Sequence, residues 1–197
     1  ALTGCAPPAQ DETIPPRATD APAASPSPSA RNGWWRASGE PTTLASGLAA
    51  PWSVVLLPEG GALISERDTG TIRELTRGGD LRTVGVVPGV VSGGESGLHG
   101  LALRPDEAGG TWLYAYHGAA DDNRVVRMPL SGQPGARGLG AVEPVFTGIP
   151  RNSTHNGGRI AFGPDGYLYV TTGDAQIRDA PQDPDALGGK ILRLTPV

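Results

Sequence analysis

The sequence lacks several features that would assign it to a class at once. Its 197 residues contain one cysteine, Cys5, which excludes an intrachain disulfide. The 16 basic residues are outnumbered by 20 acidic ones, and no basic stripe runs along the chain, so nucleic-acid binding has no electrostatic support. No apolar run is long enough to cross a bilayer. No segment combines the periodicity and the caps of an amphipathic helix.

Proline, alanine and serine dominate the first 39 residues, where large apolar side chains are almost absent. Such a segment cannot bury a core, so we predict a disordered tether over residues 1–39. Its start, Leu2-Thr3-Gly4-Cys5, resembles the lipobox of bacterial lipoproteins, where a signal peptide is removed before a cysteine that then carries lipid. Only four residues precede Cys5, with no charged or apolar signal region, so a chance match is the alternative. We expect lipidation of Cys5 and anchoring at the extracellular face of a bacterial membrane, or else a secreted or periplasmic protein.

Residues 40–197 have a different character, with short apolar runs separated by Gly, Pro and Asp. Three segments share one plan: an apolar strand, a turn around a proline, a second apolar strand, and a third strand after a polar loop. The turn prolines are 47 and 59 residues apart, at Pro58, Pro105 and Pro164. Short β-branched or aromatic runs bounded by turn residues predict β-strands. The three segments cover Trp52–Thr76, His99–Leu130 and Gly158–Pro196.

A repeat of antiparallel strands with this period is typical of β-propeller blades. We therefore predict an all-β fold, a β-propeller, with about three blades in residues 40–197. A propeller has roughly 4 to 8 blades of about 40 to 50 residues each. We accordingly interpret the chain as the N-terminal part of a longer propeller, in which each blade needs neighbours to bury both of its faces.

Polar residues and glycines precede the first strands of the second and third segments, where propeller strands begin near the central channel. The stretches "SGGESGLHG" and "STHNGGR" contain Glu95, His99, His155, Asn156 and Arg159. Glycine lets the backbone approach a ligand closely, and imidazole suits proton transfer near neutrality. These residues are therefore the candidate site.

Structural roles are open for several of these residues and their neighbours. The glycines serve equally well in ordinary loops, His117 is interpreted as a surface or structural residue, and His99 could be wedged between blades. Arg159 could brace backbone carbonyls or a carboxylate. Asp174 and the acidic stretch after it could bind Ca²⁺, but their spacing fits no EF-hand loop, so a structural turn is favoured.

Three motifs in series resemble the soluble PQQ-dependent glucose/sorbosone dehydrogenase family, which includes bacterial aldose sugar dehydrogenases. The resemblance extends from about Leu44 to Val197 and rests on "APWSVVLLPEGGALISERDTGTIREL", "HNGGRIAFGPDGYLYVTTGDA" and "LGGKILRLTP". Members are six-bladed propellers, so the resemblance implies that further blades follow. It also implies oxidation of the anomeric hydroxyl of an aldose to the lactone, with PQQ and Ca²⁺ as cofactors and an external electron acceptor as partner.

The resemblance assigns roles residue by residue. In the family the histidine of the His-x-Gly/Ser-Gly/Ser-Arg motif is the catalytic base, which implies His155 here. It implies cofactor contacts for Glu95, Asn156 and Arg159, whereas most PQQ and Ca²⁺ ligands are expected beyond Val197, so the fragment alone is expected to be inactive. The cofactor would carry the redox chemistry, and the protein would supply the base and the orientation.

Some positions depart from the family pattern. Glu95 stands where members with glucose activity often have Gln, Thr154 where some have Asp, and His99 where many have Leu. These departures support an alternative: a non-catalytic propeller lipoprotein that binds carbohydrate or protein. In either case membrane contact is expected only through lipid on Cys5.

Overall fold

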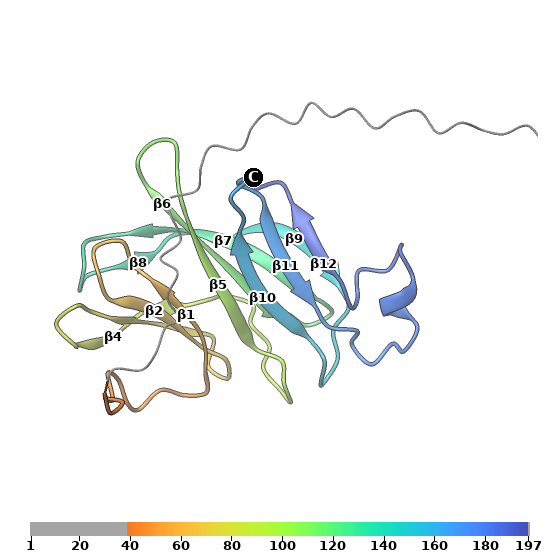
Figure 1. Ribbon diagram of the computed structural model, residues 1–197, viewed down its shortest axis with the longest axis horizontal. Helices are drawn as coiled ribbons and strands as arrows, with labels where there is room; N and C mark the ends of the chain where they lie inside the picture. Colours follow the sequence, from red (N-terminus) through yellow and green to blue (C-terminus); the bar gives the residue numbers. More distant parts are fainter. Residues whose placement is uncertain (1–38, 197) are drawn as a thin grey trace, which may run out of the picture. The chain divides into compact units, whose positions relative to one another are not determined.

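The computed structural model describes residues 39–196, in which strands and one short 3-10 turn are present and no α-helix is found (Figure 1). No helix in this part of the chain is long and apolar enough to cross a membrane. The predicted tether, up to residue 38, and Cys5 with its predicted lipid lie outside the described residues.

The first sheet has four antiparallel strands in chain order, each hydrogen-bonded to the next. Tight turns follow its first and third strands, and the first turn contains Pro58, as the sequence predicted. The strands are β1 (Pro51–Leu56), β2 (Ala62–Glu66), β3 (Thr71–Leu75) and β4 (Leu81–Val86).

The second sheet is built on three long antiparallel strands, and two shorter segments then pair with the third of these. Its strands are β5 (Leu98–Pro105), β6 (Thr111–Gly118), β7 (Asn123–Ser131), β8 (Gly138–Leu139) and β9 (Glu143–Ile149). The third sheet has three antiparallel strands, β10 (Gly157–Phe162), β11 (Leu168–Thr172) and β12 (Ile191–Leu194). The long connection before β12 contains the 3-10 turn η1 (Ala180–Gln182).

The first strands of the three sheets lie side by side, with β5 packed against both β1 and β10 (Figure 1). In a β-propeller, the first strands of the sheets surround a common central axis and the later strands lie progressively farther from it. The predicted all-β propeller with three successive blades is therefore confirmed. The loops that lead into β5 and β10 consequently meet at one end of these inner strands.

The middle blade is buried on both faces, because side chains of a strand alternate between faces. On β6, Leu113 and Ala115 face a core shared with the first blade, whereas Tyr114 and Tyr116 face a core shared with the third. All four are fully buried. Burying one such large apolar side chain contributes about 1.5–3 kcal/mol, so neighbouring blades stabilise one another and hold their connecting loops in place.

Candidate active site

Two loops from neighbouring blades meet at the site. The main-chain N–H of Glu95, before β5, donates to the carbonyl of Ser153, before β10, at 2.7 Å. The carboxylate of Glu95 accepts a hydrogen bond from the main-chain N–H of His155, also at 2.7 Å. A Cβ on Gly94 would lie 2.3 Å from the Ser153 carbonyl oxygen, so this close approach requires glycine. The structure thus brings together two residues that the sequence selected separately.

His155 presents an open imidazole whose orientation is fixed from one side. Its side chain is 58% exposed, and Nδ1 lies 2.9 Å from Oδ1 of Asp174. Because a carboxylate accepts, Nδ1 carries the hydrogen and Nε2 keeps a free lone pair. Hydrogen bonds from the Gln176 N–H and then from His155 hold the pKa of Asp174 below its ordinary value. An ionised carboxylate therefore sets the tautomer of a histidine that can act as a base.

Asp174 is a residue of the candidate site that sequence reasoning missed, because it was assigned to a structural turn. It does make a turn, since its carboxylate accepts from the Gln176 N–H at 2.9 Å. The same oxygen also accepts from the imidazole. The available signal was its position directly after a predicted strand of the blade that carries His155. Among residues 39–196 no cluster of three His, Cys, Asp or Glu side chains could hold a metal ion, so Ca²⁺ stays a prediction.

Asn156 is enclosed within the loop. It is 2% exposed. Its side-chain oxygen accepts from Asn123 at 3.0 Å, and its amide nitrogen donates to the Asn152 carbonyl at 2.9 Å. Tyr116 donates its hydroxyl to the Asn156 carbonyl at 2.7 Å. The side chain therefore shapes the turn that carries His155, and its predicted contact with a cofactor stays a prediction.

His99 is buried beneath the loop that contains Glu95 and is hydrogen-bonded to it. It is 1% exposed and its ring lies between those of Trp52 and Tyr116, with centroids 4.9 and 5.8 Å away. Its Nε2 donates to the Glu95 carbonyl at 2.8 Å, which leaves Nδ1 without a hydrogen-bond partner among the described residues. Burial lowers the pKa of His99, so the ring is neutral near pH 7. This arrangement agrees with the interpretation that His99 is wedged between blades.

Cations border the same end of the inner strands. A pocket of about 260 Å³ is lined by Trp52, Arg67, Glu95, His99, Asn156 and Gly157. The exposed guanidinium of Arg159 lies 4.2 Å from the centroid of the Trp52 ring, and one of its nitrogens is 3.4 Å from the hydroxyl of Ser53. Arg159 therefore lies against the Trp52 ring, which lines the pocket. Among the described residues it makes no hydrogen bond to His155.

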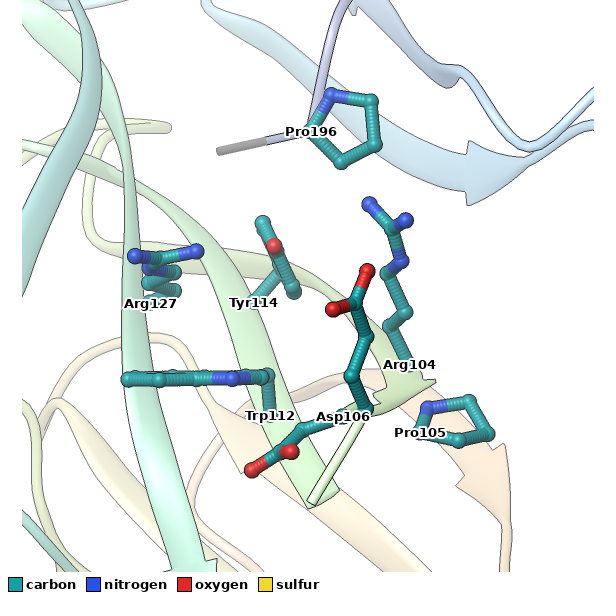
Figure 2. Close-up of a pocket in the computed structure, with 8 residues that line it drawn as sticks. Arg104, Pro105, Asp106, Trp112, Tyr114, Arg127 and Pro196 are labelled. Atoms are coloured by element: carbon teal, nitrogen blue, oxygen red, sulfur yellow. The ribbon is translucent and has the colours of Figure 1, made fainter. Parts of the chain in front are cut away.

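A second pocket lies at the opposite end of β5 (Figure 2). It encloses about 240 Å³ and is lined in part by Arg104, Trp112, Tyr114 and Arg127. The guanidinium of Arg127 stacks over Trp112 at 4.3 Å. None of the candidate site residues selected from the sequence lines this pocket, so the candidate active site is the one at the His155 end.

Comparisons with known proteins identify the family of the chain. The family described as "Glucose / Sorbosone dehydrogenase" matches residues 48–197. Aldose sugar dehydrogenase YliI of Escherichia coli (strain K12) is 33% identical over 153 residues, which cover 74% of this chain and 41% of that protein. Quinoprotein glucose dehydrogenase B of Acinetobacter calcoaceticus is 28% identical over 141 residues, 66% of this chain and 29% of that protein.

A solved structure gives the same result. The PQQ-bound aldose sugar dehydrogenase of Streptomyces coelicolor superposes with a TM-score of 0.74 at 48% identity, covering 79% of this chain and 47% of that one. The chain therefore spans less than half the length of these relatives. The family match covers all three blades and both loops of the site. The chain belongs to the glucose/sorbosone dehydrogenase family.

Proposed function

We propose that the chain contributes the base to a PQQ-dependent sugar dehydrogenase, which oxidises the anomeric hydroxyl of an aldose to the lactone and passes electrons to an external acceptor. The observation that carries the proposal is the exposed imidazole of His155, with Nδ1 bonded to the ionised carboxylate of Asp174 and Nε2 free. The names of the relatives support the substrate class and the cofactor.

The donor set at the site fits PQQ, which is a flat quinone with three carboxylates. Guanidinium groups suit carboxylates. Arg67, which also pairs with Asp68, lines the pocket, and Arg159 stacks on Trp52, another residue of its lining. When bound, PQQ supplies a quinone that accepts a hydride. Residues 39–196 contain no cluster of His, Cys, Asp or Glu side chains that could hold the Ca²⁺ implied by the family. We expect the ligands of Ca²⁺, and further ligands of PQQ, outside these residues.

The chain's own residues handle the proton. Nε2 of His155 takes the proton of the anomeric hydroxyl as the hydride leaves the anomeric carbon, so the sugar loses one proton and one hydride and becomes the lactone. The resulting imidazolium is stabilised by the Asp174 carboxylate, 2.9 Å from Nδ1. Glu95 and Asn156 hold the loop around this base.

A non-catalytic propeller that binds carbohydrate or protein is the second candidate. Glu95 favours it, because a carboxylate near the position proposed for a polyanionic cofactor is repulsive. Thr154 also favours it, because it stands where some family members have Asp, and its hydroxyl accepts a hydrogen bond from the Gln176 side chain. A carbohydrate or a protein would then be bound without turnover. Activity of the complete protein separates the two candidates.

The test is replacement of His155 by Asn, which tolerates the same left-handed backbone but offers no base. In the full-length protein loaded with PQQ and Ca²⁺, we expect His155→Asn to lower kcat on the order of 10²- to 10⁴-fold. The melting temperature and KM should stay close to those of the parent. Arg178→Gln, on an exposed position of the connection before β12, is the matched control. Undiminished turnover in His155→Asn would reject the proposed role, and absence of turnover in the parent would favour the binding protein.

A further inference from the structure

The backbone of His155 adopts a conformation that histidine does not favour. Its φ angle is +58°, in the left-handed region, where the Cβ of a non-glycine residue crowds the carbonyl oxygen. Such a conformation persists where surrounding contacts hold it, and it is characteristic of functional sites. The imidazole follows the backbone, so whatever fixes this angle also decides where Nε2 points.

Three contacts hold His155, at its main-chain N–H, its carbonyl and Nδ1. The carbonyl accepts from the Ala175 N–H at 3.1 Å, and Nδ1 bonds to Asp174. The main-chain N–H donates to the carboxylate of Glu95 at 2.7 Å. The first two contacts come from the blade that carries His155, whereas Glu95 belongs to the loop before β5 of the preceding blade.

The Glu95 contact joins a carboxylate to a main-chain N–H at 2.7 Å. Both residues are exposed, so this amide would otherwise face water. A carboxylate that accepts from an N–H forms a shorter and stronger bond than a neutral acceptor does. The position of Glu95 is also fixed, because its own N–H donates to Ser153 and its carbonyl accepts from the buried His99 ring.

We propose that Glu95 is a positioning residue, whose carboxylate holds the His155 main chain in its left-handed conformation and thereby aims the imidazole. The cofactor contact that the resemblance implies for Glu95 stays a separate prediction. Its relevance to turnover rests on the proposed dehydrogenase function, but the contact itself can be measured without activity. The carboxylate acts as a hydrogen-bond acceptor here, so glutamine, which offers a neutral acceptor, should replace it in part.

The experiment follows the His155 amide in the full chain labelled with ¹⁵N-histidine. The signal is assigned by its disappearance in His155→Asn. We expect the amide proton to exchange with solvent at least about 10-fold more slowly than an unbonded exposed amide, since it is hydrogen-bonded. This protection should decrease in the order parent, Glu95→Gln, Glu95→Ala. The imidazole ¹⁵N shifts should report a loss of the Nδ1–H tautomer in the same order. Glu107→Ala, an exposed glutamate at the opposite end of β5, should leave all of these signals unchanged.

Turnover is measured on the same variants with PQQ bound. We expect kcat to fall in the order of the exchange rates, with KM changed less, because Glu95 acts through His155. Exchange that is equally slow in all three proteins would overturn the proposal, as would a change in PQQ affinity in Glu95→Gln with His155 protection intact. If protection depends on Glu95 but the parent turns over no sugar, the positioning contact stands and the dehydrogenase function fails. Should Glu95→Ala not fold, Glu95→Gln decides by the same two criteria.

Discussion

Asp174 determines the chemistry available to His155. An imidazole with both nitrogens in water exchanges its proton between them, so only a fraction of molecules have a lone pair on the nitrogen that faces a substrate. The bond from Nδ1 to Asp174 removes this averaging. In the proposed reaction, the same carboxylate would stabilise the positive charge that appears once His155 has accepted a proton.

We predict that Asp174→Asn lowers kcat on the order of 10²-fold or more, with little effect on KM. Asparagine keeps the shape but can donate to Nδ1, which favours the tautomer with its hydrogen on Nε2. Steady-state kinetics of the full-length, PQQ-loaded protein provide the measurement. Asp179→Asn is the control, since Asp179 makes no side-chain cap on the nearby 3-10 turn. A fall of the same size in both variants would show that the effect is not specific to the His155 contact.

The sequence could indicate which residues matter at the site but not how they pair. His155, Glu95 and Arg159 stand out because polar residues and glycines interrupt the start of predicted strands. The partners are invisible at this level, because Asp174 reaches His155 only after the hairpin of β10 and β11 returns the chain to the same end. Arg159 was expected in the site, and its stacking on Trp52 depends on β1 lying near β10.

Among the strands, β5 and β10 set the spacing between the two loops of the site. A Cβ on Gly100 would lie 2.2 Å from the Gly158 carbonyl oxygen and 3.0 Å from the Ile160 nitrogen. Both obstacles are backbone atoms of the neighbouring inner strand, and backbone cannot rotate away as a flexible side chain can. The absence of a side chain at position 100 therefore lets the two blades approach closely.

We predict that Gly100→Ala destabilises the fold by about 1–3 kcal/mol, a typical cost for an added methyl group in a packed interior. Urea denaturation measures the change. Gly138→Ala is the matched control, because its nearest neighbour, the Ser131 hydroxyl, would lie 3.8 Å away at ordinary contact distance. Equal stability of the two variants would mean that β5 and β10 can separate without cost.

Strand prediction succeeded where apolar residues alternate and failed where proline and glycine interrupt them. The inner strands and their hairpins agree with the predicted segments. Strand β9 was not foreseen, because Pro144 and Gly148 within it are typical of loops. It pairs with β7 at the outer edge of its sheet, where a residue without an N–H is tolerated. Its pairing with β7 is visible only in the structure.

At the scale of the molecule, the described blades bury two neutral histidines. His117 is 1% exposed and its Nδ1 lies 2.9 Å from the Gly118 carbonyl oxygen. Burial lowers its pKa, as it does for His99. Each ring therefore stays unprotonated in the folded state at a pH where an unfolded chain, with a histidine pKa of about 6.5, binds a proton.

We predict that stability is fully present above about pH 6.5 and falls as the pH decreases below it, because only the unfolded state then gains protons. The loss near pH 5, about 1.5 pH units below the ordinary histidine pKa, should be at most about 2 kcal/mol for each buried histidine. Melting temperatures from pH 8 to pH 5 measure it. His99→Leu should flatten the dependence, and a profile identical to that of the parent would contradict the assignment. Asp174 does not contribute in this window, since its lowered pKa matters only below about pH 4.

The contact between Glu95 and His155 joins positions that are 60 residues apart in the chain. Hairpins such as β5–β6 close in about 1–10 μs, whereas a contact at this separation forms only when two sheets dock. During synthesis the loop before β5 leaves the ribosome well ahead of its partner. The strands of both blades can therefore exist before the imidazole is aimed. If Glu95 positions His155 as proposed, competence of the base would be a late event in folding that follows the docking of neighbouring blades.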